Sequence, residues 1–398
     1  MWCVKVTNFQ LTYIILYDII LMKHNRFFVI VLFVVLFLFI FVVINLKNYF
    51  KLEKFGFKKH VVQLTPEVHN PLIISSGFKG HNYSKIAEML SKIYPLKIKY
   101  HDGSSIKNME NLINKKCDLA ICQDYTVISA FLGLHPYKKK HENLRYVSLL
   151  YLETTALLVN NKSGINSWQD LKEKVICIGR NTFASYHNFM SLSKIAGYKD
   201  GDIKIIKEAI FDKNIVEEFS NGSIDGLYIS TAHPKKEIYE LYTKVRFKII
   251  GIEGLKKDLL KLKIPDFRDS TINLNDYNMG NEQGSLFKQS LGFSCCIVTR
   301  DDVPSNHIYK LTKTLFSNIE YIKSYSNDPF FKKVMENVLP SGLVSFNSLL
   351  KKHKGSLKYF KEIGIITNNS NPFCANYVGT GKCFNVTGMR HFGHGNIG

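Results

Sequence analysis

PLIISSGFKGHNYSKIAEML, from Pro71 to Leu90, is the stretch from which the architecture of the chain is predicted. It joins a short apolar strand at 72–74 to a turn of small residues at 75–77 and a helix that begins near Asn82. Glycine permits sharp turns and close approach of a ligand to the backbone, and a helix N-terminus carries unpaired N–H groups and partial positive charge. The stretch therefore predicts an α/β fold with a candidate site for an anion such as a carboxylate. The alternative is a glycine that serves packing alone.

Strand and helix patterns continue to alternate after this stretch. A strand at 96–100, a helix at 106–114 and an apolar strand at 117–123 complete a β-α-β-α-β unit with short connections. Such a unit predicts a largely parallel sheet covered by helices, and ligands bind beyond the carboxyl ends of its strands. The residues that fall at these ends are Ser76, Gly77, Gln123 and Asp124.

A second unit of the same kind begins after a long β-rich run at 146–160. It contains a strand at 175–179, a polar turn and helix that end at Gly197, and a strand at 225–230 that ends in Thr231. Two such units facing one cleft predict a two-lobed binding protein, each lobe a mostly parallel sheet flanked by helices.

We divide the chain into seven parts on these patterns. They are a cytoplasmic extension or signal n-region at 1–26, a transmembrane anchor or signal h-region at 27–46, a linker at 47–70, the first part of lobe 1 at 71–154, lobe 2 at 155–272, the return to lobe 1 with C-terminal helices at 273–365, and a disordered tail at 366–398. Hinges between the lobes are expected near 153–156 and 270–274.

The uncharged run from Phe27 to Ile44 is long enough to predict an N-terminal transmembrane helix. Basic residues precede it, as in a signal sequence, and Met22 is an alternative start. Bulky, basic residues follow it in place of a small-residue cleavage site, which favours an uncleaved anchor. The lysines at 47–59 would be kept cytoplasmic by the positive-inside rule, so charge alone leaves the orientation open.

The formal net charge is +20, but the lysines are scattered along the chain. Nucleic-acid-binding proteins usually gather such charge on one stripe, so we predict solvated lysine-rich surfaces and no nucleic-acid partner. A positive surface also attracts anionic ligands or lipid headgroups. Among the eight cysteines, only Cys374 and Cys383 look like a disulfide pair, and that pairing depends on an oxidising compartment.

Motifs of common enzyme classes are absent from the sequence. It has no P-loop, no G-x-S-x-G, no HExxH and no Cys/His spacing typical of a zinc site. We therefore expect no catalytic residue, no resident metal and no cofactor. His391 and His394 in the Gly/Asn-rich tail are at most a weak metal site.

Several motifs resemble those of one known family in order and spacing. They are ISSGFKGHNYSKIAEMLSK at 74–92, NLINKKCDLAICQDYTV at 111–127, LLVNNKSGINSWQDLKEKVICIGRNTFAS at 157–185, NGSIDGLYISTAHP at 221–234, SCCIVTRDDVPSNHIYKLTKTLFSN at 294–318 and VSFNSLLKKHKGSLKYFKEIGI at 344–365. Together they are similar to the TAXI-type solute-binding subunits of TRAP transporters. The resemblance covers about 72–365 and implies the type 2 periplasmic-binding-protein fold. The chain departs from the family at the bulky residues Phe78, Lys79, Arg180 and Phe183 of the two turns, and at 345–347.

The resemblance implies ligand contacts from the turns of both lobes. Those in lobe 1 are Ser76, Gly77, Asn82, Tyr83 and Gln123, and those in lobe 2 are Thr182, Ala184, Ser185 and Thr231. From the residues themselves, the turn at 182–185 opens a helix whose N–H groups suit a carboxylate, with a plain helix cap as the alternative. Tyr83 suits stacking or a hydrogen bond to a ligand, or a place in the core. Arg180 suits a bidentate contact with a carboxylate, or a surface position.

The function implied is an extracytoplasmic solute receptor. It would stand on the periplasmic face of the inner membrane, anchored or released, close over a small anionic amino acid or organic acid, and deliver it to a TRAP-type permease. The alternative is a membrane-tethered bilobed ligand sensor or interaction protein with no transport role.

Overall fold

A computed structural model describes residues 70–252, 255, 268–280, 283–336, 338 and 350–364. All of them belong to the second of two compact units, His60–Gly398. The predicted N-terminal extension, the membrane segment and the linker up to residue 69 lie outside the described residues. So do positions 345–347 and the tail, with its Cys374–Cys383 and His391/His394 pairs. Within the described ranges, no helix has the length and apolar character needed to cross a membrane.

Lobe 1 is built around the stretch from Pro71 to Leu90. Its elements are β1 (Leu72–Gly77), α3 (Asn82–Ile93), β2 (Leu96–Tyr100), α4 (Ser105–Ile113), β3 (Leu119–Gln123) and α5 (Asp124–Leu132). Every residue of β3 is buried, as expected for a parallel strand covered on both faces. In α3, Tyr83, Ile86, Leu90 and Ile93 are buried at helical spacing, and they pack the helix onto the sheet.

Lobe 2 repeats this order after the long strand β4 (Leu144–Asn160). Its elements are η1 (Trp168–Asp170), β5 (Val175–Cys177), α6 (Ala184–Ile195), β6 (Lys204–Ile206), α7 (Lys213–Asn221), β7 (Gly226–Thr231), α8 (Lys236–Lys244) and β8 (Phe247–Ile250). The aromatic rings of Trp168, Phe189 and Tyr228 pack on one another in its core.

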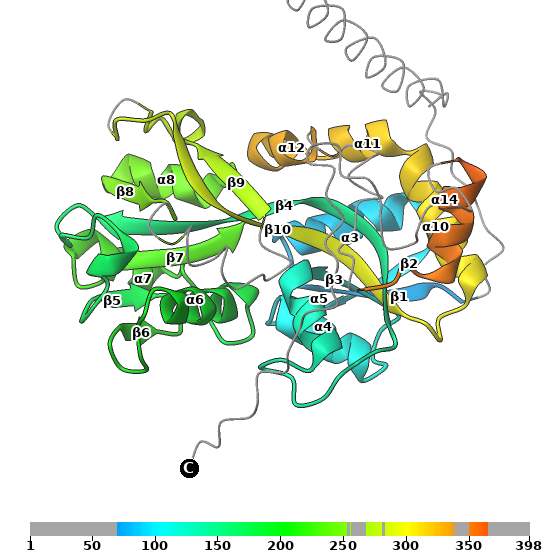
Figure 1. Cartoon of the computed structure of the whole chain (residues 1–398). Helices are drawn as coiled ribbons and strands as arrows, with labels where there is room; N and C mark the ends of the chain where they lie inside the picture. Colours follow the sequence, from blue (N-terminus) through cyan, green and yellow to red (C-terminus); the bar gives the residue numbers. More distant parts are fainter. Residues whose placement is uncertain are drawn as a thin grey trace, which may run out of the picture. The chain divides into compact units, whose positions relative to one another are not determined.

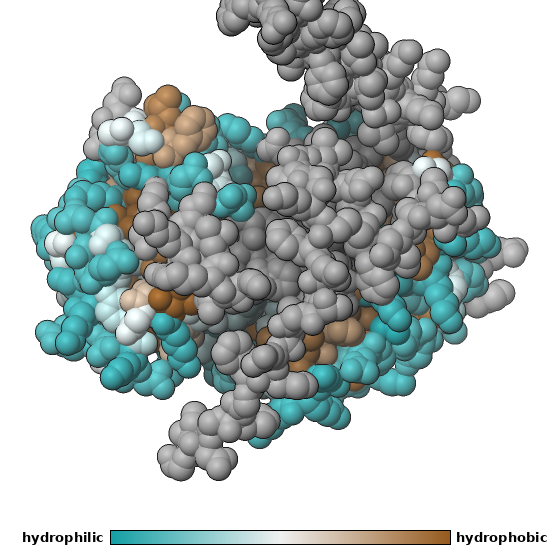
Figure 2. Space-filling view, in the orientation of Figure 1, coloured by the Kyte–Doolittle hydropathy of each residue, from teal (hydrophilic) through white to brown (hydrophobic). Residues whose placement is uncertain are grey.

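The chain then returns to lobe 1. This part contains β9 (Arg268–Asn273), η3 (Leu274–Tyr277), β10 (Phe287–Arg300), α10 (Ser305–Ser317), α11 (Ile319–Ser324), α12 (Pro329–Glu336) and α14 (Lys354–Glu362). Apolar residues of α3, α10, α12 and α14 share one buried cluster with β1 and β3. Figure 2 shows a largely hydrophilic described surface with a few hydrophobic patches, and the exposed Leu286 and Phe287 lie at the start of β10.

The sheet corrects one part of the prediction. The described strands form a single ten-stranded mixed sheet in the order β2-β1-β3-β10-β4-β7-β5-β6, with β8 on β4 and β9 on β10 (Figure 1). The β1/β2/β3 and β5/β6/β7 pairs are parallel, as predicted. However, β4 and β10 are antiparallel to each other, β10 is antiparallel to β3, and β4 is antiparallel to β7. These two strands run through both lobes in opposite directions. Two α/β lobes are therefore confirmed, but neither is a separate, mostly parallel sheet.

The two segments expected as hinges lie side by side. Residues 153–156 are in the middle of β4, and 270–274 run from β9 into η3. The Thr154 and Ser270 hydroxyls are hydrogen-bonded at 2.7 Å. A second pair, Thr155 and Ser290, joins β4 to β10 at 2.9 Å. The strands that cross between the lobes are thus β4 and β10, and hinge motion at 153–156 and 270–274 stays a prediction.

Candidate functional site

The two turns predicted to bind a ligand face each other across the lobes. The lobe 1 turn follows β1, and the lobe 2 turn follows β5 and opens α6. Phe78 and Phe183 pack edge to face with ring centroids 6.0 Å apart. Two of the four bulky residues that distinguish these turns from the resembled family therefore pack on one another.

Gln123, at the end of β3, connects the lobes by hydrogen bonds. Its Nε2 donates to Glu153 Oε2 and to Ser230 Oγ of β7, both at 2.9 Å. Its Oε1 accepts from Asn188 Nδ2 of α6 at 2.7 Å. One buried side chain thus uses its donors and its acceptor to join lobe 1, the crossing strand and lobe 2. The sequence predicted Gln123 but not Glu153, Asn188 or Ser230.

Glu153 lies at the centre of this network. Only 5% of its surface is exposed, and the Tyr83 hydroxyl donates to its Oε2 at 3.2 Å. Burial raises the pKa of Glu153 to about 7, repulsion from Asp124 adds to the rise, and hydrogen bonds from Gln123 and Tyr83 oppose it. The sequence signal for Glu153 is that it is the one charged residue of the β-rich run at 146–160, where the sequence predicts only a hinge.

Three buried polar atoms, in the two predicted turns and in α6, have no hydrogen-bond partner among the described residues. They are Ser76 Oγ at the end of β1, Thr182 Oγ1 in the lobe 2 turn and Asn188 Oδ1 in α6. A buried polar group without a partner costs about 1–3 kcal/mol, so such atoms call for an explanation. Ser76 and Thr182 are predicted site residues, one from each lobe.

Gly77 is required by the backbone of its own turn. Its φ is +79°, and a Cβ there would lie 2.7 Å from the carbonyl oxygen of Gly103. The left-handed conformation and the close approach both favour glycine. The backbone of the turn after β1 therefore requires a glycine at this position, whether or not a ligand touches it.

We expect Gly77→Ala to lower the free energy of unfolding by about 2–4 kcal/mol, because backbone strain and overlap with Gly103 add. Gly80→Ala is the matched control, since Gly80 has φ +86° but open space where a Cβ would lie. It should cost only about 1 kcal/mol, from strain alone. Urea unfolding of both variants measures the difference, and equal losses would contradict the role of the Gly103 contact.

The remaining lobe 2 candidates serve their own turn. Ala184 begins α6 and is buried, and the Ser185 hydroxyl donates to the carbonyl of Ile178 at 3.3 Å. Thr231 is paired with Thr154 at the last register position of β7 on β4. These contacts are local ones, and contact of the three residues with a ligand stays a prediction.

Arg180 is turned toward acidic side chains of lobe 2. Its guanidinium lies 3.7 Å from Glu208 and 3.6 Å from Asp212, and its side chain is 38% exposed. The structure therefore places it in a surface ion-pair group rather than in the Gln123 network.

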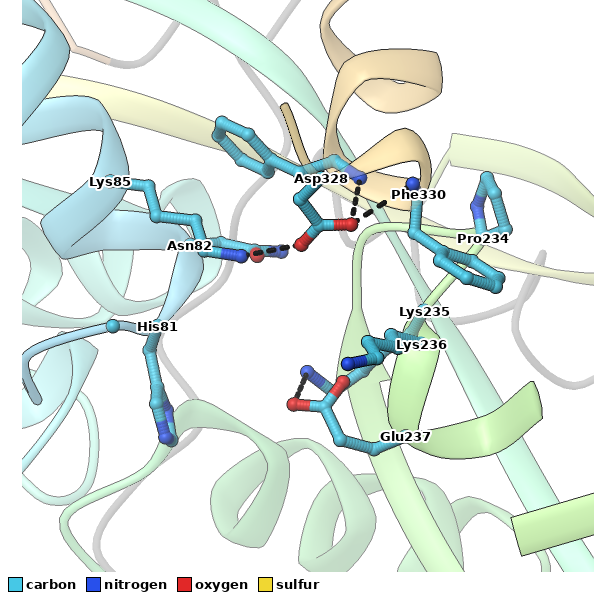
Figure 3. Close-up of a pocket in the computed structure, with 11 residues that line it drawn as sticks. His81, Asn82, Lys85, Pro234, Lys235, Lys236, Glu237, Asp328 and Phe330 are labelled. Atoms are coloured by element: carbon cyan, nitrogen blue, oxygen red, sulfur yellow. Dashed lines mark hydrogen bonds and ion pairs between the residues drawn. The ribbon is translucent and has the colours of Figure 1, made fainter. Parts of the chain in front are cut away.

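Asn82 lines a separate pocket of about 190 Å³ (Figure 3). The first turns of α3, α8 and α12 meet around it. Lys85 is paired with Asp328 at 2.6 Å, and Lys235 with Glu237 at 3.0 Å. The lysines of this pocket that point inward are thus largely neutralised.

A groove of about 250 Å³ lies between α5 and α6. Tyr125 and Ser191 are hydrogen-bonded across it at 2.8 Å, and the rings of His135 and His187 are 5.4 Å apart. These contacts complete the polar junction of the two lobes. No group of three or more metal-ligating side chains occurs in the described ranges.

A family model described as the NMT1-like family matches residues 79–364. The chain belongs to the NMT1-like family. The matched span contains the crossing strands, the Gln123 network and the lobe 2 turn, and it begins two residues after Gly77 of the lobe 1 turn.

Several solved structures are similar to this chain at low identity. The periplasmic aliphatic sulphonate binding protein SsuA from Escherichia coli is 15% identical, with 68% of this chain and 75% of that chain covered and a TM-score of 0.36. A putative sulfonate ABC transporter binding protein from Methylobacillus flagellatus is 14% identical, with coverages of 74% and 87% and a TM-score of 0.38. A putative L-cystine ABC transporter from Listeria monocytogenes is 13% identical, with coverages of 69% and 98% and a TM-score of 0.38. Similarity at this level carries no information on the ligand of this chain.

Proposed function

We propose that this protein is a solute receptor whose two lobes close over a small organic molecule. The observation that carries the proposal is the Gln123 network, in which a buried amide joins β3 to Glu153, Ser230 and Asn188. Polar side chains that converge from two lobes on a buried junction are typical of ligand clefts. The unpartnered Ser76 and Thr182 hydroxyls supply further groups for a ligand.

In the proposed mechanism the ligand bridges the lobes and stabilises the closed state. The difference in its affinity for the closed and open states drives closure. The N–H groups at the start of α6 and the hydroxyls of Ser76 and Thr182 would hold a carboxylate. Tyr83 and Gln123 complete the proposed ligand shell, with Gly77, Ala184, Ser185 and Thr231 as its backbone support. Arg180 and Asn82 stay predicted ligand contacts that lie outside the Gln123 network.

The finer proposal is a TAXI-type subunit of a TRAP transporter with the type 2 periplasmic-binding-protein fold. The receptor would act in the periplasm, tethered by its N-terminal helix or released after cleavage, and pass the solute to a TRAP-type permease. The support is the order of the six sequence motifs, which span nearly the same residues as the NMT1-like match.

A bilobed sensor without a transport role is the second candidate. The Phe78–Phe183 contact favours it, because these two rings join the turns of the lobes directly. Co-purification of the full chain with a permease would support the receptor, and signalling to a partner with no solute flux would support the sensor.

Small-angle X-ray scattering of the full chain tests the shared proposal. A panel of amino acids, keto acids and dicarboxylates should contain a ligand that reduces the radius of gyration on binding. A ligand that binds without compaction would contradict closure, and a panel with no binder would contradict the receptor.

We expect Thr182→Ala to weaken binding of such a ligand about tenfold, since one hydrogen bond to a charged group is worth roughly 1.5 kcal/mol. Its stability should change little, because its hydroxyl has no partner among the described residues. Thr243→Ala, an exposed position in α8, is the control and should bind as the unchanged protein does. Calorimetric titration measures both, and equal affinities of the two variants would remove Thr182 from the site.

A further inference from the structure

The Gln123 network contains an acidic side chain but no basic partner for it among the described residues. Glu153 is buried in it, and no ion pair among the described residues includes Glu153. The hydrogen bonds to its Oε2 come from the neutral Gln123 and Tyr83. A buried carboxylate is usually paired with a cation or a metal ion, so the cation that matches Glu153 is not supplied by this part of the chain.

We propose that Glu153 binds the positively charged amino group of the solute. The ligand class is then amino acids, and keto acids and simple dicarboxylates are excluded. This inference rests on the proposed receptor function and deepens it.

The polar groups connected to Glu153 fit an ammonium group. Gln123 joins Glu153 to Asn188 by hydrogen bonds, and Asn188 Oδ1 is a buried acceptor with no partner among the described residues. An ammonium donates three hydrogen bonds and accepts none. A carboxylate in one network with a free amide oxygen therefore recognises an amine better than it recognises an acid.

The surroundings of Glu153 contain no compensating positive charge among the described residues. The titratable groups that affect its pKa, or whose pKa it affects, are Tyr83 of α3, Cys122 of β3, Asp124 of α5, Tyr151 of its own strand, and Cys295 and Cys296 of β10. Each of these groups is neutral when protonated and negative when ionised, so none of them supplies a positive charge. Arg180, the predicted cation of the site, is instead paired with Glu208 and Asp212.

A proton signature follows from this arrangement. Without ligand, burial holds the pKa of Glu153 at about 7, so the carboxyl is mostly protonated at pH 6. Binding of an ammonium requires the ionised form, and the proton is released. Close to one proton should leave per ligand at about pH 6 and almost none at about pH 8.5. Affinity should rise about 30-fold between about pH 5.5 and pH 8 and then level off.

Matched pairs of ligands give the decisive test on the full chain. Each amino acid is compared with its 2-keto acid, for example L-glutamate with 2-oxoglutarate and L-leucine with 4-methyl-2-oxopentanoate, by calorimetric titration. The amino acid of at least one pair should bind at least about 30-fold more tightly than its keto acid, as expected for loss of one partner of a buried charge pair. Titration in buffers of different ionisation enthalpy then counts the released protons.

Three variants separate charge from structure. Glu153→Gln should weaken the amino acid at least about 30-fold and abolish proton release, whereas Glu153→Asp should retain the preference for the amine. Glu217→Gln, an exposed position in α7, is the control and should change neither quantity.

The outcomes distinguish this inference from the receptor proposal. A keto acid that binds as tightly as its amino acid, or Glu153→Gln that binds an amino acid unchanged, would overturn the role of Glu153 and leave the receptor intact. A full panel without any binder would remove the receptor itself, and the inference with it.

Discussion

Glu153→Gln is expected to raise the free energy of unfolding at pH 8 by up to about 3 kcal/mol. Burial raises the pKa of this carboxyl from 4.5 to about 7, and each pKa unit corresponds to about 1.4 kcal/mol. Below pH 4.5 the carboxyl is protonated in both states, so its contribution to stability is complete. As the pH rises to about 7, the unfolded chain loses its proton first, and this stability is lost. Glutamine is neutral at every pH and avoids the loss.

Urea unfolding at pH 4.5, 6 and 8 measures this effect. The curves of Glu153→Gln and the unchanged protein should approach each other at pH 4.5 and separate at pH 8. Glu217→Gln, exposed on α7, should follow the unchanged protein throughout. A Glu153→Gln protein that is less stable at pH 8 would show that the carboxylate itself stabilises the ligand-free fold. A more stable variant that no longer binds an amino acid would separate binding from folding.

Acid is expected to destabilise the fold through His233, which lies between β7 and α8. Its Nδ1 accepts from the Tyr277 hydroxyl at 2.6 Å, and its Nε2–H donates to the carbonyl of Thr154 at 3.2 Å. Lys235 N–H donates to the same Tyr277 oxygen at 2.9 Å, so the hydroxyl proton points to His233. The ring is therefore held neutral, with its tautomer assigned from these contacts.

Desolvation lowers the pKa of His233 from 6.5 to about 4, and Lys235 adds to the decrease. Above pH 6.5 the ring is neutral in both states and its contribution to stability is complete. As the pH falls toward 4, the unfolded chain takes up the proton first, and about 2–3 kcal/mol is lost. This loss of stability is smaller than the full pKa difference would give, because part of the His233 surface remains exposed to solvent.

The measurement is the free energy of unfolding of His233→Gln and the unchanged protein between pH 7.5 and pH 4. The variant should start about 1–3 kcal/mol lower, because Tyr277 and Thr154 lose a buried partner. It should then lose about 2–3 kcal/mol less on acidification, since the proton-binding group is gone. Parallel pH curves would place the acid sensitivity elsewhere in the molecule.

The order of the strands and helices was predictable from local patterns in the sequence. The apolar run of β3, the helical spacing of α3 and the small-residue turn after β1 predicted the first unit to within a few residues. Such signals are local, because side-chain periodicity and turn chemistry act within one element. The sequence also predicted that the turns of two lobes would face each other, and the Phe78–Phe183 contact is consistent with that prediction.

The antiparallel β4 and β10 were not predictable in the same way. Their long apolar runs fit a buried parallel strand equally well, so periodicity does not distinguish the two cases. The direction of a strand is decided by its partners, and Cys296 of β10 pairs with Cys122 of β3 and with Leu149 of β4.

The sequence by itself determined the alternation of strands and helices, the two turns and the presence of Gln123 at a strand end. Only the tertiary structure decided that Gln123 meets Glu153, 30 residues away, and Ser230, 107 residues away. It also turned Arg180 toward Glu208 and Asp212. The physical reason is that contacts between distant residues depend on sheet register and on the packing of the lobes, which no local pattern encodes.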